Sequence, residues 1–207
     1  MKVLNLYAGI GGNRKLWKDV SVTAVEINPD IAKIYQDFFP DDKVLVMDAH
    51  EYLLKHYKDF DFIWSSPPCP THSHIRKELA VEARQQNKPV YPDMKLYEEI
   101  LFCQGFVKCN WVVENVISWY EPLIKPFECG HHYFWSNYSI PEFKILSYRG
   151  HHSKLKDLYN LKGFDLSEYN GIDKRKAIRN CVVPELGLHV FKCGNYNRQI
   201  RLDEVQS

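Results

Sequence analysis

Residues 2–13 read Lys-Val-Leu-Asn-Leu-Tyr-Ala-Gly-Ile-Gly-Gly-Asn, and this stretch decides the fold class. Its first half, Val3–Tyr7, predicts a buried strand, and the glycines that follow it predict a tight turn. Glycine has no Cβ, so a turn of this kind lets the backbone approach a ligand closely. Ligands of open α/β sheets bind in the crevice outside the strand ends. The turn is therefore a candidate binding site, although a purely structural turn would give the same pattern.

The first half of the chain continues to alternate strand-like and helix-like segments. Short β-branched runs are followed by longer amphipathic ones, which predicts a mostly parallel sheet with helices on both faces. Further strands are expected at Val22–Glu26, Val44–Met47, Phe60–Trp64 and Trp111–Glu114, and helices at Asn13–Lys18, Asp30–Phe38, Glu51–Tyr57 and Asp93–Lys108. The fold class is α/β, and residues 1–207 are expected to form one domain.

The remaining segments have a weaker pattern. The polar stretch 65–92 contains several prolines and is too long for an ordinary connection, which is typical of a functional loop. Tyr133–Tyr138 and Phe143–Leu146 predict strands. Leu155–Gly171 lacks a clear period, and a last helix is expected after Pro184, a residue suited to the first helical turn.

Composition and charge exclude several classes of protein. With 45% apolar and 26% charged residues, the chain is expected to be globular rather than disordered. No apolar run reaches the roughly eighteen residues of a membrane span, and the N-terminus shows no cleavage site, so we expect a soluble, cytoplasmic protein with no membrane partner. The six cysteines are scattered along the chain, which favours a reducing compartment.

One segment is basic although the net charge of the whole chain is only +1. Between Lys144 and Arg179, nine basic residues stand against four acidic ones. Such a cluster is compatible with a solvated face, and it is equally suited to contact phosphates, because binding there releases counterions. The sequence leaves both interpretations open.

Acidic residues end two of the predicted strands. Glu26 ends the second strand, where nucleotide-binding sheets accept hydrogen bonds from ribose hydroxyls. Asp48 follows the third strand, where a carboxylate could accept from an adenine amino group, but each acid could instead cap the following helix. The spacing of Gly9, Gly11 and Gly12 differs from the dinucleotide fingerprint, so an adenosyl ligand without a pyrophosphate fits better.

Two reactive side chains belong to the next pair of strands. Cys69 stands among prolines directly after Phe60–Trp64, and its thiolate would be a nucleophile beside the proposed cleft. The alternative is that Cys69 is a small buried hydrophobe, as free cysteines commonly are. Glu114 follows three apolar strand residues, where a carboxylate is costly to bury unless it is paired, protonated or functional.

These residues in this order resemble the DNA (cytosine-5) methyltransferases. The resemblance rests on Tyr-Ala-Gly-Ile-Gly-Gly, Glu26, Asp48, Pro-Pro-Cys and Glu-Asn-Val, and Arg179–Glu185 is similar to the C-terminal Gly-Asn-x-Val-x-Pro motif. The Ser-Ser-Pro-Pro-Cys form looks most like phage or prophage members. The resemblance implies a Rossmann-like fold and a methyltransferase activity that depends on S-adenosylmethionine (AdoMet). It places the cofactor at Tyr7, Ala8, Gly9, Gly11, Gly12, Glu26, Ile27, Asp48, Ala49, Asn180 and Val182.

The resemblance also implies a reaction and a partner. Cys69 would attack C6 of a cytosine flipped out of double-stranded DNA, while Glu114 bonds the ring at N3 and C5 takes the methyl group. Pro68 and Asn115 would belong to the substrate site, Asn115 by orienting the Cys69 loop. Methylation of RNA cytosine and a noncatalytic AdoMet- or DNA-binding regulatory module are the alternatives.

The chain departs from the family pattern around the nucleophile and on a later strand. Pro70 replaces the usual Gln after the nucleophile. The Gln-x-Arg-x-Arg motif aligns with Cys129–Trp135, which contains no arginine, so a histidine could take over its role. Zinc is the other hypothesis, but the candidate ligands match no common spacing, and no metal is expected. These candidates are Cys129, His131, His132, His151 and His152.

Target recognition is the third departure. Only about forty residues separate Tyr138 from Asn180, so residues 140–175 are expected to be a reduced elaboration in place of a full target-recognition domain. Base-specific readout needs side chains against base edges, whereas phosphate contacts carry no sequence information. We therefore expect a short or relaxed site of roughly two to four base pairs, or a partner subunit or dimer that supplies recognition.

Overall fold

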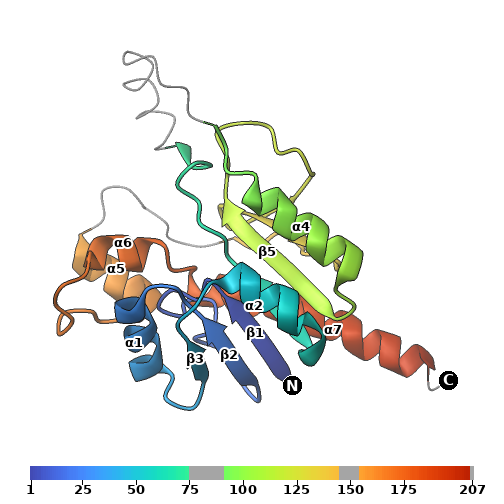
Figure 1. Cartoon of the computed structure of the whole chain (residues 1–207), viewed down its shortest axis with the longest axis horizontal. Helices are drawn as coiled ribbons and strands as arrows, with labels where there is room; N and C mark the ends of the chain where they lie inside the picture. Colours follow the sequence, from blue (N-terminus) through green and yellow to red (C-terminus); the bar gives the residue numbers. More distant parts are fainter. Residues whose placement is uncertain (75–90, 145–153, 206–207) are drawn as a thin grey trace.

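The computed structural model describes residues 1–74, 91–144 and 154–205, with side chains through residue 195 (Figure 1). In these ranges a seven-stranded sheet has the order β3-β2-β1-β4-β5-β7-β6. The strands are β1 (Lys2–Leu6), β2 (Ser21–Val25), β3 (Lys43–Leu45), β4 (Phe62–Ser65), β5 (Asn110–Val116), β6 (Phe127–Cys129) and β7 (His132–Ser136). The helices are α1 (Pro29–Phe38), α2 (Ala49–His56), α4 (Lys95–Phe106), α5 (Leu155–Lys162), α6 (Lys174–Arg179) and α7 (Pro184–Val205), with a 3-10 turn η1 (Tyr57–Asp59).

Strand pairing defines where a ligand can bind. β1 to β5 run parallel to one another, whereas β7 pairs antiparallel with β5 and β6. The chain moves outward from β1 through β2 to β3, and then returns to place β4 on the other side of β1. The carboxyl ends of β1 and β4 therefore flank the topological switch point, where open α/β sheets bind ligands.

Helices cover both faces of the sheet, as the sequence predicted (Figure 1). On one face, Leu53 of α2 and Ile100 of α4 are buried in the same apolar cluster. On the other face, Leu186 of α7 is buried in a second cluster, and Tyr35 of α1 packs with Ala24 of β2. Because both faces are covered, the central strands are apolar on both sides rather than alternating.

The segment after the glycine turn differs from the sequence prediction. Residues 12–16 form successive turns and residues 17 and 18 have no regular structure, so the predicted helix Asn13–Lys18 is absent. The backbone at Asn13 lies directly against α7, so close that a Cβ on Gly187 would be 2.6 Å from the Asn13 Cα atom. The indole of Trp17 also donates to the Gly187 carbonyl at 3.3 Å. These tertiary contacts leave no room for a helical turn, and they override the amphipathic pattern.

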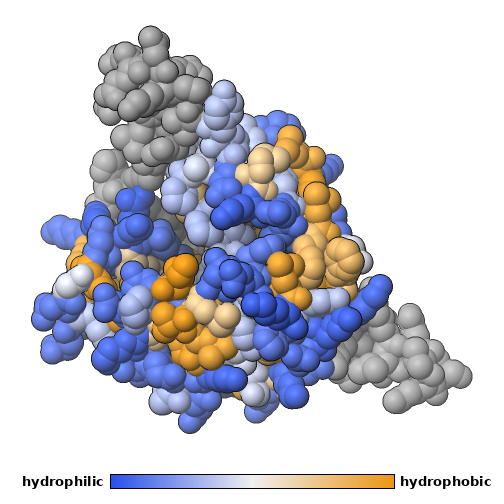
Figure 2. All heavy atoms as spheres, viewed as in Figure 1, coloured by the Kyte–Doolittle hydropathy of each residue, from blue (hydrophilic) through white to orange (hydrophobic). Residues whose placement is uncertain are grey.

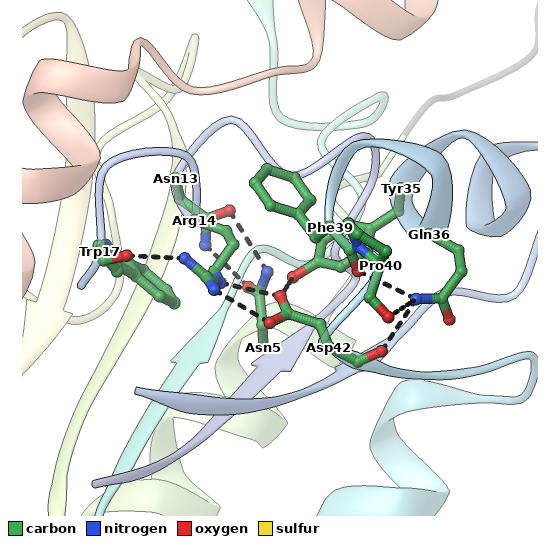
Figure 3. Close-up of polar contacts among 9 residues, drawn as sticks. All are labelled: Asn5, Asn13, Arg14, Trp17, Tyr35, Gln36, Phe39, Pro40 and Asp42. Carbon is green, nitrogen blue, oxygen red and sulfur yellow. Dashed lines mark hydrogen bonds and ion pairs between the residues drawn. The ribbon is translucent and has the colours of Figure 1, made fainter. Parts of the chain in front are cut away.

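A buried ion pair fixes the same segment (Figure 3). The Arg14 guanidinium donates to both carboxylate oxygens of Asp42, at 2.8 Å from Nε and 3.0 Å from Nη2. The Tyr35 hydroxyl donates to Asp42 at 2.8 Å, and the Asn13 amide bonds the Asn5 amide of β1. Bidentate Arg–carboxylate pairs impose geometry as well as energy, so this cluster ties the turn to β1 and α1.

Two predictions for the second half were incomplete. Phe143 and Lys144 are not in a strand, and the rest of the predicted strand Phe143–Leu146 lies outside the described residues. The segment without a clear period contains helix α5, which ends where Gly163 adopts a left-handed conformation at φ 66°. Each described helix is too short or too polar to cross a membrane.

Residues 155–181 pack beside the glycine turn and α1. Leu158 of α5 and Ile178 of α6 are buried in one cluster with Ile34 of α1 and Ile10 of the glycine turn. This part of the chain therefore shares an apolar cluster of its own with α1 and the glycine turn. That residues 140–175 replace a recognition domain stays a prediction, because part of that range lies outside the described residues.

Candidate active site

The glycine turn begins with backbone conformations that few residues adopt. Tyr7, Gly9 and Gly11 have φ values of 53°, 54° and 85°. Glycine reaches this left-handed region without steric cost, whereas Tyr7 does so at an energetic penalty, which is common at ligand sites. The Ala8 amide donates to the Val25 carbonyl at 3.0 Å, so the turn stays attached to β2.

Gly12 is required by a close contact with the C-terminal part of the chain. A Cβ at Gly12 would overlap the Cys181 sulfur and the Val182 carbonyl oxygen. Cys181 and Val182 are buried, whereas Asn180 is exposed at the end of α6. The structure thus brings Cys181 and Val182 against the glycine turn, and the binding of a cofactor by Asn180 and Val182 stays a prediction.

The two strand-end acids have different roles in the structure. Glu26 accepts from the Gly9 amide at 3.0 Å with one oxygen and from the Asn28 amide at 2.9 Å with the other. Asp48 is the N-cap of α2 and accepts from the Glu51 amide at 2.9 Å. Asp48 therefore caps α2, which was the alternative to cofactor binding, while Glu26 joins the glycine turn to the end of β2.

Apolar surface is exposed beside these acids. Ile27 is 66% exposed and Val46 is 56% exposed, directly after β2 and β3. Figure 2 shows apolar atoms on the surface where Figure 1 draws α1 and β3. Ala49, by contrast, is buried in the first turn of α2. An uncovered apolar surface next to polar acceptors suits a ligand with a flat, partly apolar ring.

Cys69 lies in a turn that follows β4. The amides of His72 and Ser73 both donate to the Cys69 carbonyl, at 3.0 and 3.2 Å. Asn115 of β5 donates to the Pro67 carbonyl at 3.0 Å, so it supports the backbone two residues before the thiol. Pro68 is exposed. Burial raises the pKa of the Cys69 thiol, and the nearby Glu114 carboxylate raises it further, while the Lys176 ammonium partly lowers it.

Glu114 is paired with a histidine. Its carboxylate is 8% exposed, and one oxygen lies 2.6 Å from Nδ1 of His132. The short distance between a nearly buried carboxylate and an imidazole is typical of a charge-assisted hydrogen bond. This pairing explains how β5 accommodates Glu114 among apolar neighbours.

A buried carboxylate that the sequence analysis did not single out lies under the same crevice. Glu99 of α4 is 1% exposed and accepts from the hydroxyls of Tyr7 and Ser65, the former at 2.9 Å. His50 of α2 lies 3.1 Å from the same carboxylate. This hydrogen bond raises the pKa of His50, and burial together with Glu99 raises the pKa of Tyr7. Glu99 thus joins the ends of β1 and β4 to α2.

The candidate zinc ligands are not grouped together in the described residues. The Cys129 thiol lies 3.5 Å from the Pro141 carbonyl, and His132 bonds Glu114. Within residues 1–74, 91–144 and 154–205, no three His, Cys, Asp or Glu side chains are grouped as a metal site would require. His151 and His152 lie outside the described residues.

The mostly parallel sheet with helices on both faces and a switch point between β1 and β4 is a Rossmann-like α/β fold. Residues 1–95 match the family model of the C-5 cytosine-specific DNA methylases. The resemblance inferred from the sequence is confirmed over these residues. None of the curated proteins matches the sequence significantly.

The three solved structures compared with the chain have TM-scores below 0.5. A hypothetical protein of Thermus thermophilus is 15% identical, with 65% of this chain and 73% of that chain covered and a TM-score of 0.44. DNMT2 of Spodoptera frugiperda is 30% identical, with 56% and 35% covered and a TM-score of 0.39. An AdoMet-dependent methyltransferase of Agrobacterium tumefaciens is 13% identical, with 58% and 40% covered and a TM-score of 0.39. The alignments span well under half the length of the last two proteins.

Proposed function

We propose that this chain transfers a methyl group from AdoMet to C5 of cytosine in DNA. The observation that carries the proposal is the placement of Cys69 in the turn after β4 and of Glu114 within the adjacent parallel strand β5, where its carboxylate acts electrostatically on the thiol. The family match over residues 1–95 supports the reaction class.

The residues around the glycine turn fit an adenosyl cofactor. A carboxylate offers about four acceptor positions, so Glu26 can accept from ribose hydroxyls in addition to its two backbone donors. Asp48 likewise keeps acceptor capacity beyond its capping bond. The exposed side chain of Ile27 provides apolar surface for the adenine ring. AdoMet, when bound here, would supply an electrophilic methyl group and leave as S-adenosylhomocysteine.

The reaction needs a nucleophile, an acceptor for ring charge and a leaving step. Cys69, once deprotonated, adds through sulfur to C6 of the cytosine, and the electron pair of the C5–C6 bond makes C5 nucleophilic. The protonated carboxyl of Glu114 would donate its hydrogen to N3 and so stabilise the negative charge that develops on the ring. C5 takes the methyl group and then loses its proton to a base, while the bond from Cys69 to C6 breaks and the C5–C6 double bond returns.

Purified protein tests this reaction directly. Incubated with AdoMet carrying a labelled methyl group, it should label duplex DNA, and the labelled base should be 5-methylcytosine. Cys69→Ala should abolish transfer and leave AdoMet affinity nearly unchanged. DNA containing 5-fluorocytosine should form a covalent adduct with wild-type protein, because fluorine prevents the loss of the C5 proton.

Controls separate the competing outcomes. Cys193→Ala replaces a partly buried thiol on α7 and should retain activity. Labelling of RNA instead of DNA would assign the same chemistry to the other nucleic acid. AdoMet binding without transfer to either nucleic acid would favour the regulatory alternative and refute the proposal.

Recognition of DNA would use the basic segment Lys144–Arg179. Lys154, Lys156 and Lys176 are exposed there, so they can reach phosphates, whereas Lys162 is buried. Methylation of randomised duplexes, read by sequencing, should reveal a short or relaxed site and a steep dependence on salt. A long, stringent site would contradict this, and activity that appears only with a second polypeptide would assign recognition to a partner.

A further inference from the structure

His132 contacts Glu114 from a segment that lacks the arginine of the family motif. Residues 127–136, which form β6, its turn and β7, contain no arginine or lysine. The family's arginine motif aligns with this segment, so its charge must come from another residue or be absent. His132 is the described side chain of this segment that contacts Glu114.

The hairpin places His132 with little freedom. The two-residue turn Gly130–His131 has φ values of 55° and 68°, as in the tight hairpin turns that match strand twist. His132 follows as the first residue of β7 and pairs with Val116. Glu114 pairs with Phe134, so His132 is its diagonal neighbour on the same face of the sheet. The backbone alone thus directs the imidazole to the carboxylate.

The other charged groups near Glu114 interact mainly with other atoms. Lys162 of α5 acts electrostatically on Glu114, but its ammonium donates to the carbonyls of Arg179 and Cys181. Lys176 of α6 acts on Cys69. Among the described side chains, His132 therefore makes the direct hydrogen bond to Glu114, and this bond occupies one oxygen, Oε1.

We propose that His132 is a positioning residue for the methyl transfer, taking over from the missing arginine; this inference rests on the proposed function. It donates to Oε1 of Glu114 and thereby leaves Oε2, which carries the proton of the carboxyl, to donate to N3 of the target cytosine. In its protonated form it also adds a positive charge beside the ring when Cys69 attacks C6. The imidazole is 21% exposed, so the position has space on its solvent side for a longer cation.

Three substitutions at one position separate the hydrogen bond from the charge. His132→Arg keeps both, His132→Gln keeps a donor without charge, and His132→Leu removes both. His56→Gln is a matched control, because His56 lies near Asp59 at 3.2 Å in a surface pair at the C-terminal end of α2, the end opposite Asp48. Steady-state kinetics on DNA and calorimetric AdoMet titration should be measured for all four.

The arginine variant should stay within about fivefold of wild type, while the leucine variant should lose about 100-fold in kcat, the usual effect of removing one preorganised donor. The glutamine variant should fall between them. The KM for AdoMet and the AdoMet affinity should not change. A variant that lost activity because its structure was disturbed would also bind AdoMet more weakly. His56→Gln should behave as wild type.

The outcomes separate this inference from the proposed function. An inactive wild-type protein would overturn the proposed function and this inference with it. An active wild type with unchanged kcat in His132→Leu would overturn the role of His132 alone. An arginine variant as impaired as the leucine variant, with AdoMet affinity intact, would also refute it.

Discussion

Gly12→Ala is the substitution whose effect the structure determines most directly. The added Cβ would overlap the Cys181 sulfur and the Val182 carbonyl oxygen, and it would lie 3.1 Å from the Val182 amide nitrogen. Ordinary Cβ contacts lie between 3.4 and 4 Å, so the segment at residues 181–182 must retract. Two of the three obstacles are backbone atoms, which cannot rotate away as a flexible side chain does.

The cost should reach the upper end of the range for overpacking, about 3 kcal/mol. In a domain of this length each kcal/mol lowers Tm by roughly 2–4 °C, which gives a fall of about 6–12 °C. Differential scanning calorimetry or thermal melts followed by circular dichroism would measure it. The loss should appear in the absence of any ligand, because it is a packing effect.

Gly105→Ala is the matched control. Gly105 lies in α4, is exposed and has open space where its Cβ would be. Alanine there should stabilise the helix by about 0.5–1 kcal/mol, with a small rise in Tm. The reasoning would be wrong if Gly12→Ala melted within about 2 °C of wild type, or if both alanines shifted Tm in the same direction by similar amounts.

Two further substitutions test the polar clusters. Asp42→Ala should destabilise the protein by about 3 kcal/mol in urea titration, because it leaves the largely buried Arg14 without its partner; Asp37→Ala, which breaks an exposed pair, should cost less than about 1 kcal/mol. His50→Gln should alter the pH dependence of Tm. The bond to Glu99 raises the pKa of His50, so its stabilisation is complete below about pH 6.5 and is lost as pH rises through the higher pKa of the folded state. A difference in Tm between wild type and variant that stays constant from about pH 5 to about pH 9 would contradict this.

Sequence periodicity predicted the parallel core well because both faces of those strands are buried. It failed at residues 13–18, where the amphipathic pattern was real. There the contacts of Asn13 with Gly187, which lies 174 residues later in the chain, exclude a helix. It also missed α5, since one short helix with few buried residues gives a weak signal. In both cases the deciding contacts were distant in sequence.

The same limit applies to the candidate site. Cys69, Glu26 and Glu114 stand directly at predicted strand ends, so their clustering could be expected from topology alone. Glu99 could not be recognised, because it occupies a helix and its partners come from three separate segments. A useful signal would have been its position among the apolar residues 96–103, where an unpaired carboxylate is costly.

The contact between Gly12 and residues 181–182 has a consequence for how the protein is made. The glycine turn emerges early from a ribosome, while the segment that covers its back is synthesised near the end. Contacts of such high sequence separation form late and slow folding. During synthesis, a nascent chain containing residues 1–95 therefore holds an uncovered turn and an open apolar sheet face, which α7 later buries. Such intermediates aggregate readily, so yield on expression should depend on chaperone supply and on translation through the C-terminal segment.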